Sequence, residues 1–178
     1  MTLRVVLILA IAQSVVFPFA RMRDGKLWTT TNLDVDVRQS YCYADNELNC
    51  GRYGRLYTWP AAQSVCRTLG DGWRLPTDDE WRQLAKQYGG VGGDLGDGKA
   101  AYEALVDGSG TGFNARLGGS RSADGRYDRL DAHGFYWTAS ARNEQTAPFY
   151  NFGKGSLALY RQPEGGKQMA ASVRCVRD

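Results

Sequence analysis

Apolar residues recur at helical spacing soon after Thr58. Ala62, Val65 and Leu69 are three or four positions apart, so a helix would place all of them on one face. Thr58 belongs to the residue types that begin helices, and Gly70 to those that end them. The pattern predicts a first helix over residues 59–69 whose apolar face packs on the core.

A second helix is predicted over residues 78–88. Thr77 and Glu80 have the spacing of a capping box, in which each side chain accepts a hydrogen bond from the other residue's backbone N–H. Four apolar positions then form one stripe: Trp81, Leu84, Ala85 and Tyr88. Glycines at 89 and 90 end this helix. A shorter third helix is expected over residues 99–106.

The rest of the chain has the pattern of short strands between turns. Asp24-Gly25 is a hairpin signal ahead of a strand that begins at Leu27. Beyond residue 108, further strands are predicted over 113–115, 134–138, 149–152, 157–160 and 172–176. Helices first and short antiparallel strands afterwards indicate an α+β fold.

Composition narrows the class of protein. The 178 residues are 43% hydrophobic and 23% charged, which is ordinary for a single globular domain and excludes wholesale disorder. The net charge of +3 is spread along the chain without a basic block, so we expect no nucleic-acid partner. A single histidine argues against histidine-rich zinc chemistry.

The N-terminus has the pattern of a secretion leader. Arg4 precedes an apolar run over residues 5–12, and Ala10 and Ala12 have the spacing of a cleavage site. Cleavage after Ala20 is an alternative. The apolar run is too short for a transmembrane helix, so no membrane span is expected once the leader is removed.

The same residues allow a second interpretation, a buried N-terminal strand over residues 15–17. The leader interpretation divides the chain into a leader and N-terminal segment over 1–20 and a single domain over 21–178. It predicts a protein that is secreted or held at the cell-envelope surface.

Four cysteines allow three pairings. No C-x₂-C spacing is present, so disulfides are favoured over a zinc site. Cys42 and Cys50 flank a short polar loop that a bond between them would close. That pairing leaves Cys66, on the apolar face of the first predicted helix, for Cys175.

Several separated blocks of sequence carry a family resemblance. They are Trp28-x-x-x-Asn32-Leu33, Ser40-Tyr41-Cys42-Tyr43, Gly54-Arg55-Leu56-Tyr57-Thr58-Trp59, Gly72-Trp73-Arg74-Leu75-Pro76-Thr77, Gly112-Phe113-Asn114-Ala115, Gly134-Phe135-Tyr136-Trp137-Thr138-Ala139-Ser140 and Ser172-Val173-Arg174-Cys175-Val176-Arg177-Asp178. Together they resemble the Fibrobacter succinogenes major paralogous domain family, from about Trp28 to the last residue.

The resemblance implies a C-type-lectin-like fold, close to formylglycine-generating enzyme and to the C-terminal domains of bacterial collagen-like adhesins. Two main helices would pack on a short-stranded, loop-rich antiparallel sheet. In that fold a cysteine on the first helix bonds one on the last strand, which supports the pairing of Cys66 with Cys175. Members of the family look like secreted or surface proteins without an established activity.

The resemblance does not extend to catalysis. Formylglycine-generating enzyme binds copper through two free cysteines near its C-terminal end, and here only Cys175 lies in that region. A hydrolase would instead need a pair of carboxylates, and the candidates for such a pair are Asp124, Asp128 and Asp131. However, Asp124-Gly125 is first of all a turn signal. We expect a protein that is not an enzyme and keep a cryptic hydrolase as an alternative.

Calcium is the cofactor that the sequence suggests. Asp124 and Asp128 offer hard oxygen ligands for a structural calcium ion, and the glycine–aspartate loop over 94–98 offers others. The Glu-Pro-Asn and Trp-Asn-Asp triplets of calcium-dependent lectins are missing, so sugar recognition through calcium is not expected. No other cofactor is expected.

Aromatic, arginine and asparagine residues alternate through the second half of the chain. Planar rings stack on sugar or peptide faces, while guanidinium and amide groups supply directional hydrogen bonds. The loops over 118–134 and 141–148 are the predicted site, with these ligand-binding residues: Arg121, Tyr127, Asp128, Tyr136, Arg142 and Asn143. His133 is expected to be a loop or packing residue.

The predicted function is therefore non-catalytic recognition of an extracellular glycan or protein, in adhesion or a related role. A structural subunit of an extracellular surface assembly is a further alternative. It would show an exposed apolar patch and oligomers that depend on concentration.

Overall fold

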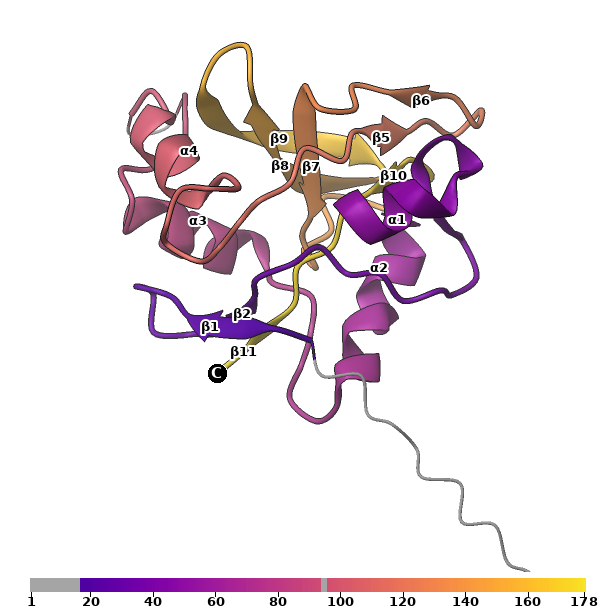
Figure 1. The fold of residues 1–178 in the computed structure, drawn as a ribbon, viewed down its shortest axis with the longest axis horizontal. Coiled ribbons are helices and arrows are strands. Elements are labelled where there is room, and N and C mark those ends of the chain that lie inside the picture. The colour runs from indigo at the N-terminus through magenta and orange to yellow at the C-terminus, as the bar shows by residue number, and fades with distance from the viewer. Residues whose placement is uncertain (1–16, 94–95) are drawn as a thin grey trace, which may run out of the picture.

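The computed structural model describes residues 17–93 and 96–178 (Figure 1). Its α-helices are α1 (Glu47–Tyr53), α2 (Trp59–Val65), α3 (Asp78–Lys86) and α4 (Lys99–Leu105), with 3₁₀ turns η1 (Tyr43–Asp45) and η2 (Cys66–Leu69). Its strands are β1 (Phe19–Arg21), β2 (Leu27–Thr29), β3 (Ser40–Tyr41), β4 (Leu56–Thr58), β5 (Ser120–Arg121), β6 (Tyr127–Asp128), β7 (His133–Trp137), β8 (Thr146–Gly153), β9 (Ala158–Gly166), β10 (Ala170–Ala171) and β11 (Val176–Arg177). The fold is α+β, as the sequence predicts.

The strands form small sheets in which the named strands pair antiparallel. Their orders are β1-β2-β11, β3-β4-β10-β5-β6 and β7-β8-β9. In the first sheet β11, near the C-terminus, pairs with β2 from the beginning of the domain. In the second, β10 joins β4 to β5 and so brings two distant parts of the chain together.

The two main helices follow the sequence prediction closely. The first runs as α2 and then as η2, and Thr58 stands at its N-cap without a side-chain capping bond, since its hydroxyl donates to Gln39 Oε1 at 3.3 Å instead. In α3 both halves of the capping box are present: Glu80 N donates to Thr77 Oγ1 at 3.2 Å, and Thr77 N donates to Glu80 Oε2 at 2.8 Å. The third predicted helix is α4.

Interactions beyond the capping box also keep the Glu80 carboxylate ionised. Burial would raise its pKa, but Arg74, whose guanidinium donates two bonds of 2.6 Å, together with Thr77 N and Lys26, brings the pKa down to about 2. The folded pKa lies below the ordinary value of 4.5, so the stabilisation is present above pH 4.5 and is lost as the pH falls toward 2.

We expect Glu80→Gln to lower the free energy of unfolding by about 2 kcal/mol at pH 7, because a charge-assisted network and part of the helix cap are lost. Urea unfolding of both proteins between pH 7 and pH 2 checks this prediction. The difference should shrink as the pH falls below 4.5. A difference that stays constant with pH would contradict an ionised Glu80 as its source.

The buried side chains form two clusters. In the first, the ring centres of Trp28 and Trp81 lie 5.1 Å apart. Trp81 also stacks on Tyr150, with the ring centres 5.1 Å apart. The second surrounds the fully buried Trp137 and includes Cys66 and Cys175. Strand β7 lies between the clusters and contributes residues to both, so it is covered on both faces.

Two predicted strands differ in the structure. Residues 113–115 form no strand, because buried Arg174 occupies the carbonyls of Phe113 and Asn114. Residues 172–176 are mostly irregular between β10 and β11, because their backbone bonds go to different segments: Ser172 N donates to Phe135 O, and Cys175 O accepts from Thr29 N. Helix α1 was not predicted, and β8 and β9 are longer than expected.

Both expected disulfides are present. Cys42 bonds Cys50, and Cys66 bonds Cys175, which closes a sequence separation of 109. Disulfides persist in oxidising compartments, so they fit a protein outside the cytoplasm. Across the described residues, no helix has the length and apolar character needed to cross a membrane.

The predicted leader, residues 5–12, lies outside the described residues and stays a prediction. Strand β1 already pairs with β2 from Phe19 onward, so the boundary predicted between residues 20 and 21 falls inside a strand. Cleavage after Ala20 would cut β1, whereas cleavage after Ala12 would leave it whole.

Candidate functional site

Three of the predicted ligand-binding residues lie on the hairpin that β5 and β6 form: Arg121, Tyr127 and Asp128. Arg121 in β5 pairs with Tyr127 in β6. Between them the chain makes a tight turn, in which Ser122 N donates to Arg126 O at 2.8 Å and Gly125 has a φ of +91°. A positive φ suits glycine, so the Asp-Gly turn signal is confirmed here.

Arg121 is enclosed by tyrosine rings. Its guanidinium carbon lies 4.0 Å from the ring centre of Tyr41 and 5.7 Å from that of Tyr127. Tyr43 packs against Tyr127 with ring centres 5.1 Å apart. We call Tyr41, Tyr43, Arg121 and Tyr127 the aromatic hairpin surface; all four side chains are partly exposed.

The hydroxyl of Tyr127 fixes this surface to the loop before α1. It donates to Asp45 Oδ1 at 2.6 Å, and burial together with this bond raises the pKa of Tyr127. Within the described part of the chain, Arg121 Nε is buried without a hydrogen-bond partner. The rings of Tyr41 and Tyr127 therefore contribute to the orientation of Arg121.

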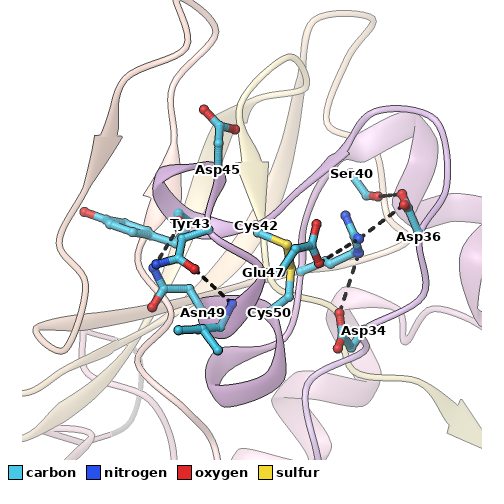
Figure 2. The surroundings of a disulfide bond; sticks show 12 residues. Asp34, Asp36, Ser40, Cys42, Tyr43, Asp45, Glu47, Asn49 and Cys50 are labelled. Atoms are coloured by element: carbon cyan, nitrogen blue, oxygen red, sulfur yellow. Dashed lines mark hydrogen bonds and ion pairs between the residues drawn. A yellow bond between two sulfur atoms is a disulfide. The ribbon is translucent and has the colours of Figure 1, made fainter.

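The Cys42–Cys50 disulfide holds the loop that carries Tyr43 and Asp45. Figure 2 shows Tyr43 and Asn49 on one side of this disulfide and the carboxylates Asp34 and Asp36 on the other. Asn49 Nδ2 donates to Tyr43 O at 2.9 Å and so anchors the loop to α1. In Figure 1 the β5–β6 hairpin lies beside α1.

A buried arginine supports the other side of the loop. Arg55 is only 8% exposed and contacts Asp36 at 3.2 Å, Glu47 at 3.5 Å and Asp34 at 3.6 Å (Figure 2). Burial raises the pKa of Asp34, although Arg55 opposes the shift. Because Arg55 contacts all three carboxylates, we interpret this cluster as a support for the loop and not as a binding site for a metal ion.

Other predicted residues lie elsewhere. Tyr136 is fully buried, and its hydroxyl donates to Arg116 O at 2.6 Å; its assignment as a ligand contact is wrong, because no ligand can reach it. Arg142 pairs with Glu164 at 2.6 Å, in a hollow beside the start of α3. Asn143 Oδ1 accepts backbone bonds inside its own turn. These two residues do not join the aromatic hairpin surface.

The carboxylates proposed for calcium are individually occupied. Asp124 accepts from Ser122 Oγ and from Arg126 Nε, and exposed Asp128 lies 3.5 Å from Arg129. Neither belongs to a cluster of three ligand groups in the described ranges; Cys42, Glu47 and Cys50 do, but both cysteines are in a disulfide. The geometry does not favour calcium at Asp124 and Asp128.

The same contacts bear on the hydrolase alternative. The Ser122 hydroxyl lowers the pKa of Asp124, so this carboxyl is unsuited to act as a general acid near neutral pH. Asp131 instead accepts from Tyr53 at 2.7 Å, away from the hairpin turn. His133 stacks on Phe135 with ring planes 6° apart, which confirms it as a packing residue.

Three residues of this site were not identified from the sequence. Tyr41 and Tyr43 belong to the aromatic hairpin surface, and Asp45 holds Tyr127 in place. The only local signal was the matched Tyr-Cys-Tyr block at 41–43, which marks a disulfide as readily as a binding surface. Their contacts with the hairpin join segments far apart in the sequence: the Arg121 guanidinium lies over the Tyr41 ring, Tyr43 packs against Tyr127, and Asp45 accepts from the Tyr127 hydroxyl.

Comparison with known proteins places the chain in a family. The family description Fibrobacter succinogenes major domain matches residues 17–177, which is nearly the whole chain. No curated protein and no solved structure matches it. The protein belongs to the Fibrobacter succinogenes major domain family.

Proposed function

We propose that this protein is a secreted or surface-held bacterial domain that binds a glycan or a protein on its aromatic hairpin surface and catalyses no reaction. The observation that carries the proposal is Arg121, stacked 4.0 Å over Tyr41 beside Tyr127. Partly exposed rings supply apolar faces, and the guanidinium supplies directional donors. Because a disulfide and a hairpin hold these groups, little conformational entropy is lost on binding.

We also propose that the α+β fold is C-type-lectin-like. The disulfide from Cys66, at the end of the α2 helix, to Cys175, just before β11, supports this, as does the pairing of β11 with β2. Such a fold presents recognition loops on a disulfide-held core, which suits the position of the hairpin.

Surface assembly is the weaker alternative. Large exposed hydrophobic side chains in the described residues are Phe19, Leu48 and Leu157. They lie on β1, on α1 and in the β8–β9 turn, which Figure 1 shows in separate parts of the molecule. Separated side chains do not make the continuous apolar patch that an assembly interface requires.

The proposal is tested with a glycan and protein array and the double variant Arg121→Gln/Tyr127→Phe. Tyr127→Phe keeps the ring contact and removes only the hydroxyl. We expect at least about tenfold weaker binding of any ligand found, because the charge-assisted donors of Arg121 and the polar hydroxyl of Tyr127 are lost together. Circular dichroism should show the same fold.

Arg142→Gln is the matched control, since it removes one arginine from the other predicted loop. It should leave binding unchanged. Loss of binding with Arg142→Gln alone would move the site to the β7–β8 loop and contradict the proposal. An array without a reproducible ligand for the wild-type protein would also count against it.

A further inference from the structure

A second surface feature lies outside the aromatic hairpin surface. It is a cleft of about 560 Å³ lined by the end of α1, by α4 and by the segments around residues 106–107, 115–117, 131 and 154. In Figure 1 the segment that joins α4 to β5 runs between α4 and α1. The volume is within the range of about 300–1,000 Å³ typical of ligand pockets.

The walls of the cleft are cross-linked by hydrogen bonds. Tyr53 donates its hydroxyl proton to Asp131 Oδ1 at 2.7 Å, and Asp131 N donates to Leu117 O at 2.9 Å. Lys154 N donates to Ala132 O at 2.9 Å, which ties the β8–β9 turn to the same wall. The cleft is thus built from segments that hold one another in place.

Positive charge exceeds negative charge in the cleft, and much of it is unpaired. Three cations line it, Arg52, Arg116 and Lys154, against two carboxylates, Asp107 and Asp131. Arg116 forms a loose ion pair with Asp107, with Nε at 3.9 Å, and its Nη1 donates to Arg52 O; Nε itself is buried without a hydrogen-bond partner among the described residues. Within those residues neither Arg52 nor Lys154 has a carboxylate partner.

The remaining lining suits a ligand that also carries hydroxyl groups. The carboxylates of Asp107 and Asp131 accept hydrogen bonds from hydroxyls and repel a dense anion such as phosphate. Val106, Ala115 and Leu117 offer an apolar wall to C–H groups. Burial and Asp131 raise the pKa of Tyr53, so its phenol keeps its proton at neutral pH.

We propose that this cleft binds a carboxylated sugar, a uronic acid unit of an acidic polysaccharide. The sugar carboxylate meets the unpaired cations, its hydroxyls meet the aspartates, and its C–H face packs on the apolar wall. The site is separate from the aromatic hairpin surface, and either site can fail its test without affecting the other.

Isothermal titration of the whole chain with trigalacturonate tests the proposal, with its methyl ester as the uncharged ligand of the same shape. The acid should bind, and added salt should weaken it because the contacts are partly exposed ion pairs. The ester should bind at least about tenfold more weakly, as expected when a charge-assisted bond is lost. Inorganic phosphate should neither bind nor compete.

Two variants assign the binding to this cleft. Lys154→Gln and Arg52→Gln should each weaken trigalacturonate binding about tenfold, while Arg38→Gln, an exposed arginine elsewhere on the surface, should not. Melting temperatures measured on all three show that the fold is kept.

Four outcomes overturn the proposal: no binding of trigalacturonate, equal binding of acid and ester, unchanged binding in both cleft variants, or equal losses in the Arg38 control. Competition by phosphate would reassign the cleft to small anions in general. None of these outcomes bears on the array test of Arg121 and Tyr127.

Discussion

Replacing Cys66 and Cys175 together by alanine should lower the free energy of unfolding by about 4–5 kcal/mol and the melting temperature by roughly 10–15 °C. The bond closes a separation of 109 residues, so its removal frees a long loop in the unfolded chain. Both sulfurs are fully buried in the second core cluster, so packing is lost as well. Scanning calorimetry without reductant measures the effect.

The Cys42–Cys50 bond supplies the matched control. It spans a separation of only 8, for which the same chain-entropy argument gives about 2–3 kcal/mol. The double alanine variant at these positions should therefore be the milder of the two. If it destabilised the protein as much as the loss of the long-range bond does, loop length would not be the source of the stability.

Local signals explain which helices were predictable. Helix α3 carries its cap and its apolar stripe within a few residues, so its sequence is sufficient to identify it. Helix α1 lacks such a stripe: its buried residues are Cys50 and Tyr53, while Leu48 is 81% exposed. Its N-cap, Asn46, and the disulfide hold it instead, and neither contributes to hydrophobic periodicity.

The candidate site shows the same limit. Arg121 and Tyr127 were predictable because they share one hairpin, but Tyr41 and Tyr43 come from a much earlier segment of the chain and reach them only through tertiary side-chain contacts. Tyr136 was misassigned because alternation along a strand assumes one solvent-exposed face. Strand β7 is covered on both faces, with Tyr136 in one cluster and Trp137 in the other.

Arg174 is the position where a single substitution should cost most. Its side chain is fully buried, and its guanidinium donates to the carbonyls of Thr29 at 2.7 Å, Phe113 at 2.6 Å and Asn114 at 2.6 Å. Nε donates to Asn32 Oδ1 at 2.9 Å. Burial lowers the pKa of Arg174 to about 10, so the group still carries its charge at neutral pH.

We expect Arg174→Met to lower the free energy of unfolding by about 4 kcal/mol, since buried acceptors left without donors cost about 1–3 kcal/mol each and the relief of a desolvated charge offsets only part of this. Arg174→Lys should lower the free energy of unfolding by nearly as much, because an ammonium group cannot reach acceptors spread around a planar guanidinium. Urea unfolding at pH 7 gives both values.

Arg177→Met is the control, because Arg177 is partly exposed and lies over the ring of Trp73 at 5.1 Å rather than among buried carbonyls. It should cost less than about 1 kcal/mol. Replacing a buried ion pair by apolar residues can stabilise a protein when both partners are removed together. Here three of the partners of Arg174 are backbone carbonyls, which no substitution removes. A stable Arg174→Met protein would therefore mean that water or a shifted backbone satisfies those carbonyls, and that Arg174 does not hold these segments together.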